Sequence, residues 1–143
     1  LEDYLREESI FSEDIAIMLP LWLYDHGGLA MRCGSFHEDQ QGFDSGRVGV
    51  IYITKKKIRE EYNVKRISKA RILQITKYLQ NEVKTYDDYL QGNVYGYSHS
   101  RLSSCDHDEE HKDIIDSCGG FIGDISTCGI LDEFDLSQWT REL

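Results

Sequence analysis

The sequence predicts an α+β fold in which an antiparallel sheet of about four to five strands carries one long and one short helix on one face. Three observations lead to this prediction. Apolar segments of β-type composition lie on both sides of the middle of the chain, one long segment repeats apolar residues at helical spacing, and glycines separate neighbouring strand segments. With 143 residues, 40% of them hydrophobic, the chain can bury one core, and we expect a single domain over residues 15–143.

The first strands are expected after an acidic N-terminal segment, residues 1–14. Bulky apolar residues fill positions 15–24 and predict a strand. The next four residues, Asp25-His26-Gly27-Gly28, form a turn sequence because glycines can adopt positive φ, so residues 29–33 are expected to return as the second strand of a hairpin. A long loop over residues 34–46 then leads to a strand over residues 47–53.

Two helices are predicted next. Thr54 is a suitable N-cap for a short helix that ends at Asn63. Ser68 is a suitable N-cap for a long helix that ends at Gly92. The apolar residues of the long helix recur at spacings of three and four and so share one face: Ile72, Ile75, Leu79, Val83, Tyr86 and Leu90.

The last third of the chain predicts a second hairpin and a tail. Residues 94–100 have β-type composition, and residues 114–118 are expected to return as their partner across an acidic loop, residues 102–113. Apolar residues of the last twenty positions predict a short helix or ordered tail that docks on the domain.

Charge is strongly divided along the chain. The net charge is −10, yet the segment from Arg47 to Lys84 holds eleven Lys or Arg and three Glu, a charge of +8. The other residues therefore hold five of the 16 basic and 23 of the 26 acidic side chains, a charge of −18. We expect one basic and one acidic face, able to bind partners of opposite charge.

Composition predicts a cytoplasmic protein that crosses no membrane. The longest apolar run, residues 15–24, is half of the about 20 residues that span a bilayer. The chain starts at Leu1 without a basic leader, so we expect native residues before it. The cysteines are few and unevenly spaced, which predicts free thiols: Cys33, Cys105, Cys118 and Cys128.

Four potential zinc ligands lie within fourteen residues: Cys105, His107, His111 and Cys118. Their spacings differ from the paired knuckles of common zinc modules. A loop with exposed histidines, and with Cys118 as a small buried side chain in a strand, is the favoured alternative. We therefore expect no metal or other cofactor.

Three short sequences, at residues 25–26, 44–45 and 116–118, contain the residue types of a nucleophilic catalytic centre. However, Asp-His and Asp-Ser sequences are also typical of tight turns, and the chain has no Gly-x-Ser-x-Gly elbow. We therefore expect turn-forming or capping roles, and no catalysis, for the residues concerned: Asp25, His26, Asp44, Ser45, Asp116 and Cys118.

Cations of the middle segment could neutralise nucleic-acid phosphates. Three of them flank the start of the long helix, and two lie one heptad apart along it: Lys65, Arg66, Lys69, Lys77 and Lys84. The alternative is a solvated helix face that compensates the acidic remainder. The regular interleaving of aromatic residues with cations that is typical of single-strand binders is missing.

Acidic residues gather near the N-terminus and in the loop over residues 102–113. Carboxylates on a surface can imitate phosphates and occupy the basic nucleic-acid channel of a partner protein. The alternative is ordinary acidity that keeps a small protein soluble. The residues concerned are Glu7, Glu8, Glu13, Asp106, Asp108, Glu109 and Glu110.

Three motifs are distinctive: Tyr-Asp-His-Gly-Gly at 24–28, Asp-Ser-Gly-Arg-Val-Gly-Val-Ile-Tyr-Ile at 44–53 and Asp-Ser-Cys-Gly-Gly-Phe at 116–121. Together they resemble a family of small, largely uncharacterised proteins encoded by phages, plasmids and integrative elements. The resemblance covers residues 20–123. The Cys-His loop at 103–112 departs from the family pattern.

The resemblance implies the cytoplasm of a host cell and an anti-defence role. With the acidic surface, it leads to our main expectation: a non-enzymatic protein that binds and inhibits a host restriction or CRISPR nuclease complex by nucleic-acid mimicry. Direct nucleic-acid binding through the basic helix and a small Cys/His-dependent enzyme are the alternatives.

Overall fold

The structure, a computed structural model of the 143-residue chain, describes residues 14–39, 41–104 and 110–133. The chain divides into two compact units, Leu1–Gln91 and Gly92–Leu143, which we call unit 1 and unit 2 and describe separately. Whether they fold together as the single domain that the sequence predicts stays a prediction.

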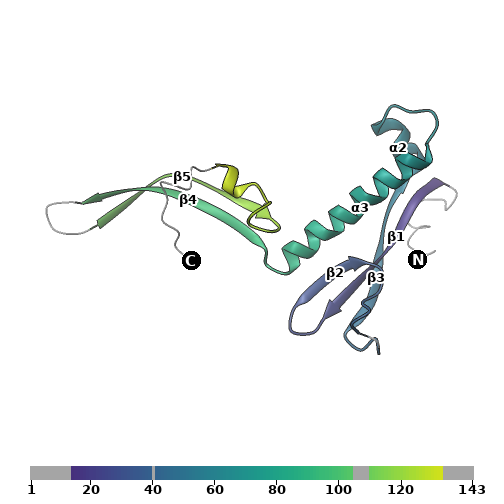
Figure 1. The fold of residues 1–143 in the computed structure, drawn as a ribbon, viewed down its shortest axis with the longest axis horizontal. Coiled ribbons are helices and arrows are strands. Elements are labelled where there is room, and N and C mark those ends of the chain that lie inside the picture. The colour runs from purple at the N-terminus through teal and green to yellow at the C-terminus, as the bar shows by residue number, and fades with distance from the viewer. Residues whose placement is uncertain (1–13, 40, 105–109, 134–143) are drawn as a thin grey trace. The chain divides into compact units, whose positions relative to one another are not determined.

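The α+β class is confirmed by the described elements (Figure 1). In chain order they are β1 (Ile15–Asp25), β2 (Leu29–Cys33), β3 (Ser45–Thr54), α2 (Lys55–Glu61), α3 (Lys69–Leu90), β4 (Val94–Ser104), β5 (Glu110–Ile122) and the 3₁₀-helix η2 (Ile130–Glu133). The strands form two antiparallel sheets. Unit 1 holds a three-stranded sheet in the order β2-β1-β3, and unit 2 holds a two-stranded sheet of β4 and β5.

The sheet of unit 1 is built around β1, whose bulky apolar residues suit a central strand. β1 pairs antiparallel with β2 through the turn at residues 26–28, and with β3 on its other edge. Gly27 has a φ of 72° in this turn, a conformation that glycine adopts without strain. The predicted hairpin is therefore confirmed, and β3 starts at Ser45, two residues before its predicted start.

Both helices of unit 1 start at the predicted caps. The Thr54 hydroxyl accepts a hydrogen bond from the Lys57 amide at 3.2 Å, and the Ser68 hydroxyl accepts one from the Arg71 amide at 3.2 Å. Asn63, just beyond α2, has a φ of 49°, which ends the helical path. None of the helices in the described parts of the chain is long and apolar enough to cross a membrane.

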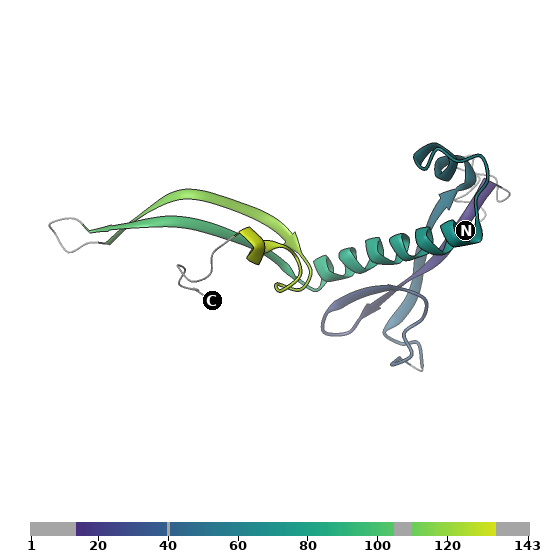
Figure 2. The ribbon, with the colours of Figure 1, turned by 45° about the horizontal axis from the view of Figure 1, so that its top comes forward.

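The core of unit 1 lies between α3 and one face of the sheet, and Figure 2 shows the helix crossing that face. Ile75 and Leu79 of α3 pack with Ile17 of β1 and Ile53 of β3, and Ile58 of α2 closes the cluster with no exposed surface. Burial of such side chains is the main stabilising term in a domain of this size.

Three residues of the predicted apolar face of α3 are buried, two are half-buried, and Tyr86 is exposed. The side chain of Tyr86 is 49% exposed, because the neighbouring Asp87 takes the position that faces β2. The Asp87 carboxylate accepts a hydrogen bond from the Met31 amide at 2.7 Å. The end of α3 is thus held by a polar contact rather than by a tyrosine ring.

Unit 2 is a longer hairpin than the sequence predicts. The expected loop at residues 102–113 is wrong in extent, because β4 continues to Ser104 and β5 begins at Glu110. Ladder hydrogen bonds join backbone groups, so polar residues can extend a solvent-exposed hairpin. Cys118 is exposed on β5 rather than buried. η2 buries Ile130, and the rest of the predicted tail, residues 134–143, lies outside the described residues.

Gly96 occupies a tight position in this hairpin. It faces Gly119, and the register between β4 and β5 shifts between Tyr95 and Gly96. A Cβ atom on Gly96 would lie 3.1 Å from the carbonyl oxygen of Cys118. The close approach of the two backbones at this point therefore favours glycine.

We expect Ile75→Ala to lower the free energy of unfolding by about 2–5 kcal/mol, because it removes a fully packed side chain and leaves a cavity. Leu73→Ala is the matched control, since Leu73 lies on the same helix with 61% of its surface exposed, and we expect it to have little effect. Urea denaturation measures both. Equal losses for the two variants would contradict the assigned core.

Candidate anion-binding site

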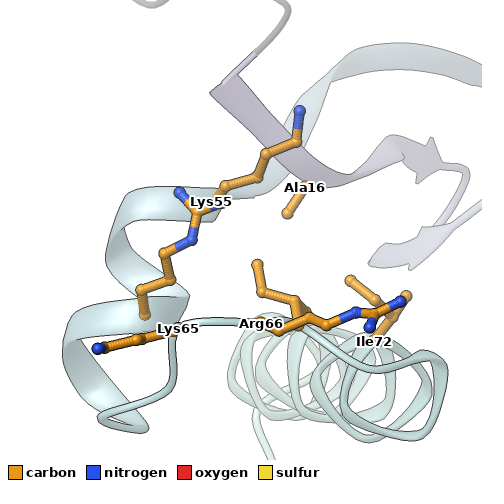
Figure 3. Close-up of a pocket in the computed structure, with 7 residues that line it drawn as sticks. Ala16, Lys55, Lys65, Arg66 and Ile72 are labelled. Carbon is orange, nitrogen blue, oxygen red and sulfur yellow. The ribbon is translucent and has the colours of Figure 1, made fainter.

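Four cationic side chains surround a hollow of about 280 Å³ in unit 1 (Figure 3). Lys55 and Arg59 come from α2, and Lys65 and Arg66 come from the segment that joins α2 to α3. The other lining residues are apolar: Ala16, Ile67 and Ile72. We call this feature the basic hollow.

The local fold explains why these cations gather. The Thr54 cap turns the chain directly from β3 into α2, and the Val64 amide bonds to the Arg59 carbonyl at 3.1 Å just after the helix ends. Ile67 and Ile72 pack against the core. The connecting segment is thereby held close to α2, with its basic residues toward solvent.

The positive charge is spread around the hollow rather than focused at one point. In Figure 3 the side chains of Lys65 and Arg66 point in opposite directions, and that of Lys55 extends toward β1. None of the described residues that line the hollow is a carboxylate. Among the described residues, no ion pair involves Arg59, Lys65 or Arg66, so their charge is not compensated within this part of the molecule.

The structure brings together only some of the predicted nucleic-acid-binding residues. Lys65 and Arg66 line the hollow, and Lys69 starts α3 beside them. Lys77 and Lys84 lie further along α3, about 12 and 22 Å from Lys69 along the helix axis. The Lys84 ammonium also bonds to Asp88 at 2.8 Å.

Lys55 is absent from the predicted set. Its signal was the run of three lysines at residues 55–57, which form the first turn of the short helix that leads to the start of α3.

The predicted turn residues of unit 1 hold a loop together. The His26 imidazole Nδ1 lies 3.2 Å from the Asp44 carboxylate, and the Asp25 amide bonds to the Asp44 carbonyl at 2.8 Å. Asp39 accepts hydrogen bonds from three backbone amides of the loop, those of Phe43, Asp44 and Ser45. These contacts are the turn-forming role expected of such residues.

The remaining predicted turn residues belong to unit 2. Asp116 accepts hydrogen bonds from the Tyr97 hydroxyl at 3.2 Å and from the Ser117 amide at 2.8 Å. The Cys118 thiol is exposed. In unit 1, burial raises the pKa of the Cys33 thiol, which lowers its reactivity because the thiolate is the nucleophile.

The candidate zinc ligands Cys105 and His107, and the side chain of His111, lie outside the described residues. Within the described ranges, no three His, Cys, Asp or Glu side chains are placed to share a metal ion. The predicted acidic contact residues also lie outside them: Glu7, Glu8, Glu13, Asp106, Asp108, Glu109 and the side chain of Glu110.

No protein-family model, curated protein or solved structure matches the chain. The resemblance to proteins of mobile elements therefore stays a prediction.

We expect Asp39→Ala to lower the melting temperature by loosening the loop before β3. Burial tends to raise the pKa of Asp39, but hydrogen bonds from Ser45, Asp44 and Phe43 outweigh it and hold the pKa below its ordinary value of 3.8. The stabilisation is therefore complete above pH 3.8 and is lost as the pH falls through the folded-state pKa. The difference in melting temperature between the wild type and Asp39→Ala should therefore shrink as the pH falls through that pKa.

Thermal unfolding from neutral to acid pH measures this effect. Asp25→Ala is the control, because it removes a nearby exposed carboxylate whose side chain accepts no hydrogen bond from another described residue. A difference between wild type and Asp39→Ala that does not change with pH would reject the proposed role of the carboxylate.

Proposed function

We propose that unit 1 binds the phosphate backbone of nucleic acid through the basic hollow. The observation that carries this proposal is the gathering of Lys55, Arg59, Lys65 and Arg66 around one hollow to which no described residue contributes a carboxylate, in a protein of net charge −10. In such an acidic protein, a local surplus of cations is a specific feature rather than a consequence of composition.

The arrangement suits a chain of phosphates better than one small anion. A site for a single phosphate directs several donors at one point, as the backbone amides of a glycine-rich loop do. Here the cationic groups diverge, and their aliphatic stems and apolar neighbours form the wall of the hollow. Divergent cations can contact phosphates that lie several ångströms apart along a backbone.

The distribution of charge between the two units supports the same assignment. Unit 1 contains 13 basic and 15 acidic residues, a net charge of −2, whereas residues 92–143 contain three basic and eleven acidic residues, a net charge of −8. A polyanion is therefore expected to contact unit 1.

Binding should weaken as salt increases, because each neutralised phosphate releases counterions. For four contacts we expect a slope of log K against log salt of about −3.6 with duplex DNA and about −2.8 with a single strand. The double variant Lys65→Glu/Arg66→Glu should weaken binding for all sequences and reduce the magnitude of the slope by about two.

Fluorescence anisotropy with labelled oligonucleotides measures affinity and slope. The matched control is Lys77→Glu/Lys84→Glu, which makes the same charge change on α3 away from the hollow. We expect the control to have a much smaller effect. Equal effects of the two double variants would show that net charge, and not the hollow, determines binding.

Inhibition of a restriction or CRISPR nuclease complex stays a prediction, since its acidic contact residues lie outside the described part of the chain. The acidic composition of residues 92–143 supports a contact of that kind in unit 2. The two functions use different units and are compatible with each other.

A further inference from the structure

No helix of the described part of the chain packs on one face of the three-stranded sheet, and this face holds aromatic rings among arginines. Ile17 and Leu19 of β1 belong to the core under α3. Side chains alternate between the two faces along a strand, so Trp22 and Tyr24 lie on the opposite face. This face was not visible in the sequence, because its residues come from separate segments of the chain.

Trp22 lies between two arginines on this face. Its cross-strand neighbours are Arg32 on β2 and Arg47 on β3, and cross-strand neighbours point to the same side of a sheet. Arg47 is exposed, and among the described residues it has no ion pair. One cation beside the indole is therefore available to a ligand.

A second group of rings adjoins Trp22. The Tyr24 ring lies 5.4 Å from that of Phe36, and the Arg32 guanidinium lies 4.0 Å over the Phe36 ring. Arg32 also pairs with Glu38 at 2.8 Å, while its Nε is buried without a hydrogen-bond partner. These contacts join Tyr24, Phe36 and Arg32 in one group, and Arg32 is the cross-strand neighbour of Trp22. We call Trp22, Tyr24, Arg32, Phe36 and Arg47 the aromatic face.

The aromatic face and the basic hollow lie on the same unit. Ala16, which lines the hollow, and Trp22 are both in β1, about 20 Å apart along the strand. Proteins that bind single-stranded nucleic acid combine aromatic rings, on which bases stack, with cations that follow the backbone. Duplex DNA hides its bases in the stack, so it can use the hollow but not the rings.

We propose that the nucleic acid bound by this protein is single-stranded, with a base stacked on Trp22 and a phosphate contacted by Arg47. This proposal rests on the proposed function of the basic hollow and adds the class of nucleic acid. Charge complementarity at Arg47 and the indole ring of its cross-strand neighbour Trp22 favour a nucleic acid over an uncharged protein surface.

Tryptophan fluorescence tests the proposal directly. The chain has two tryptophans, so Trp139→Phe leaves Trp22 as the reporter. We expect oligothymidylate to quench Trp22, and inorganic polyphosphate and duplex DNA to bind without quenching it, because neither offers an unpaired base. Quenching by polyphosphate, or its absence with a bound single strand, would overturn the stacking contact.

Substitutions at Trp22 provide a second measurement. Trp22→Leu should weaken single-strand binding on the order of tenfold to a hundredfold and leave polyphosphate binding unchanged. Trp22→Phe, which keeps a ring, should retain most of the affinity and controls for damage to the fold. If Trp22→Leu binds single strands as the wild type does, or if the protein only self-associates through this face, the proposal is wrong.

The same titrations separate this proposal from the one on which it rests. Polyphosphate binding that is lost in Lys65→Glu/Arg66→Glu, without any quenching by oligothymidylate, supports the basic hollow and rejects the aromatic face. Quenching by oligothymidylate that survives this double variant unchanged supports the aromatic face and rejects the hollow.

Discussion

The packing of α3 on the sheet is the contact on which the rest of unit 1 depends. Ile75 and Leu79 of α3 meet Ile17 of β1 and Ile53 of β3. This contact turns one face of the sheet into a core, and it fixes where α3 begins. Because α2 must close the same core through Ile58, the segment between the two helices has little choice of position, and its cations are placed as a result.

Local chemistry made much of unit 1 predictable. The caps at Thr54 and Ser68, the turn at residues 26–28 and the stripe of α3 all depend on residues close in sequence, and the structure confirms them. Tyr86 was placed wrongly because spacing alone does not show that Asp87 reaches the Met31 amide, 56 residues away. The extent of the β4–β5 hairpin was also not predicted. Backbone hydrogen bonds join its two strands, so the paired residues need not alternate between apolar and polar in the sequence.

In the candidate sites too, features set by residues close in sequence were predictable and features set by distant residues were not. Lys65 and Arg66 were predictable from their cluster at the entry to α3, whereas the contribution of Lys55 depends on the turn that returns α2 to that entry. Trp22, Arg32 and Arg47 come together only through strand pairing. None of the three residues forms part of a recognisable pattern in its own segment. They become neighbours through the register of the strands, which the sequence alone does not reveal.

Gly96 helps to determine which side chains of β4 and β5 lie on each face of unit 2. Polar residues fill much of β4 and β5 on both faces, so side-chain burial does little to distinguish one alignment of these strands from the next. The contact between the Gly96 position and the Cys118 carbonyl is a steric constraint that belongs to one alignment. A slip by one residue would exchange the inward and outward sides of every residue beyond it. The choice of which acidic side chains this hairpin presents to a partner therefore depends on a residue that has no side chain.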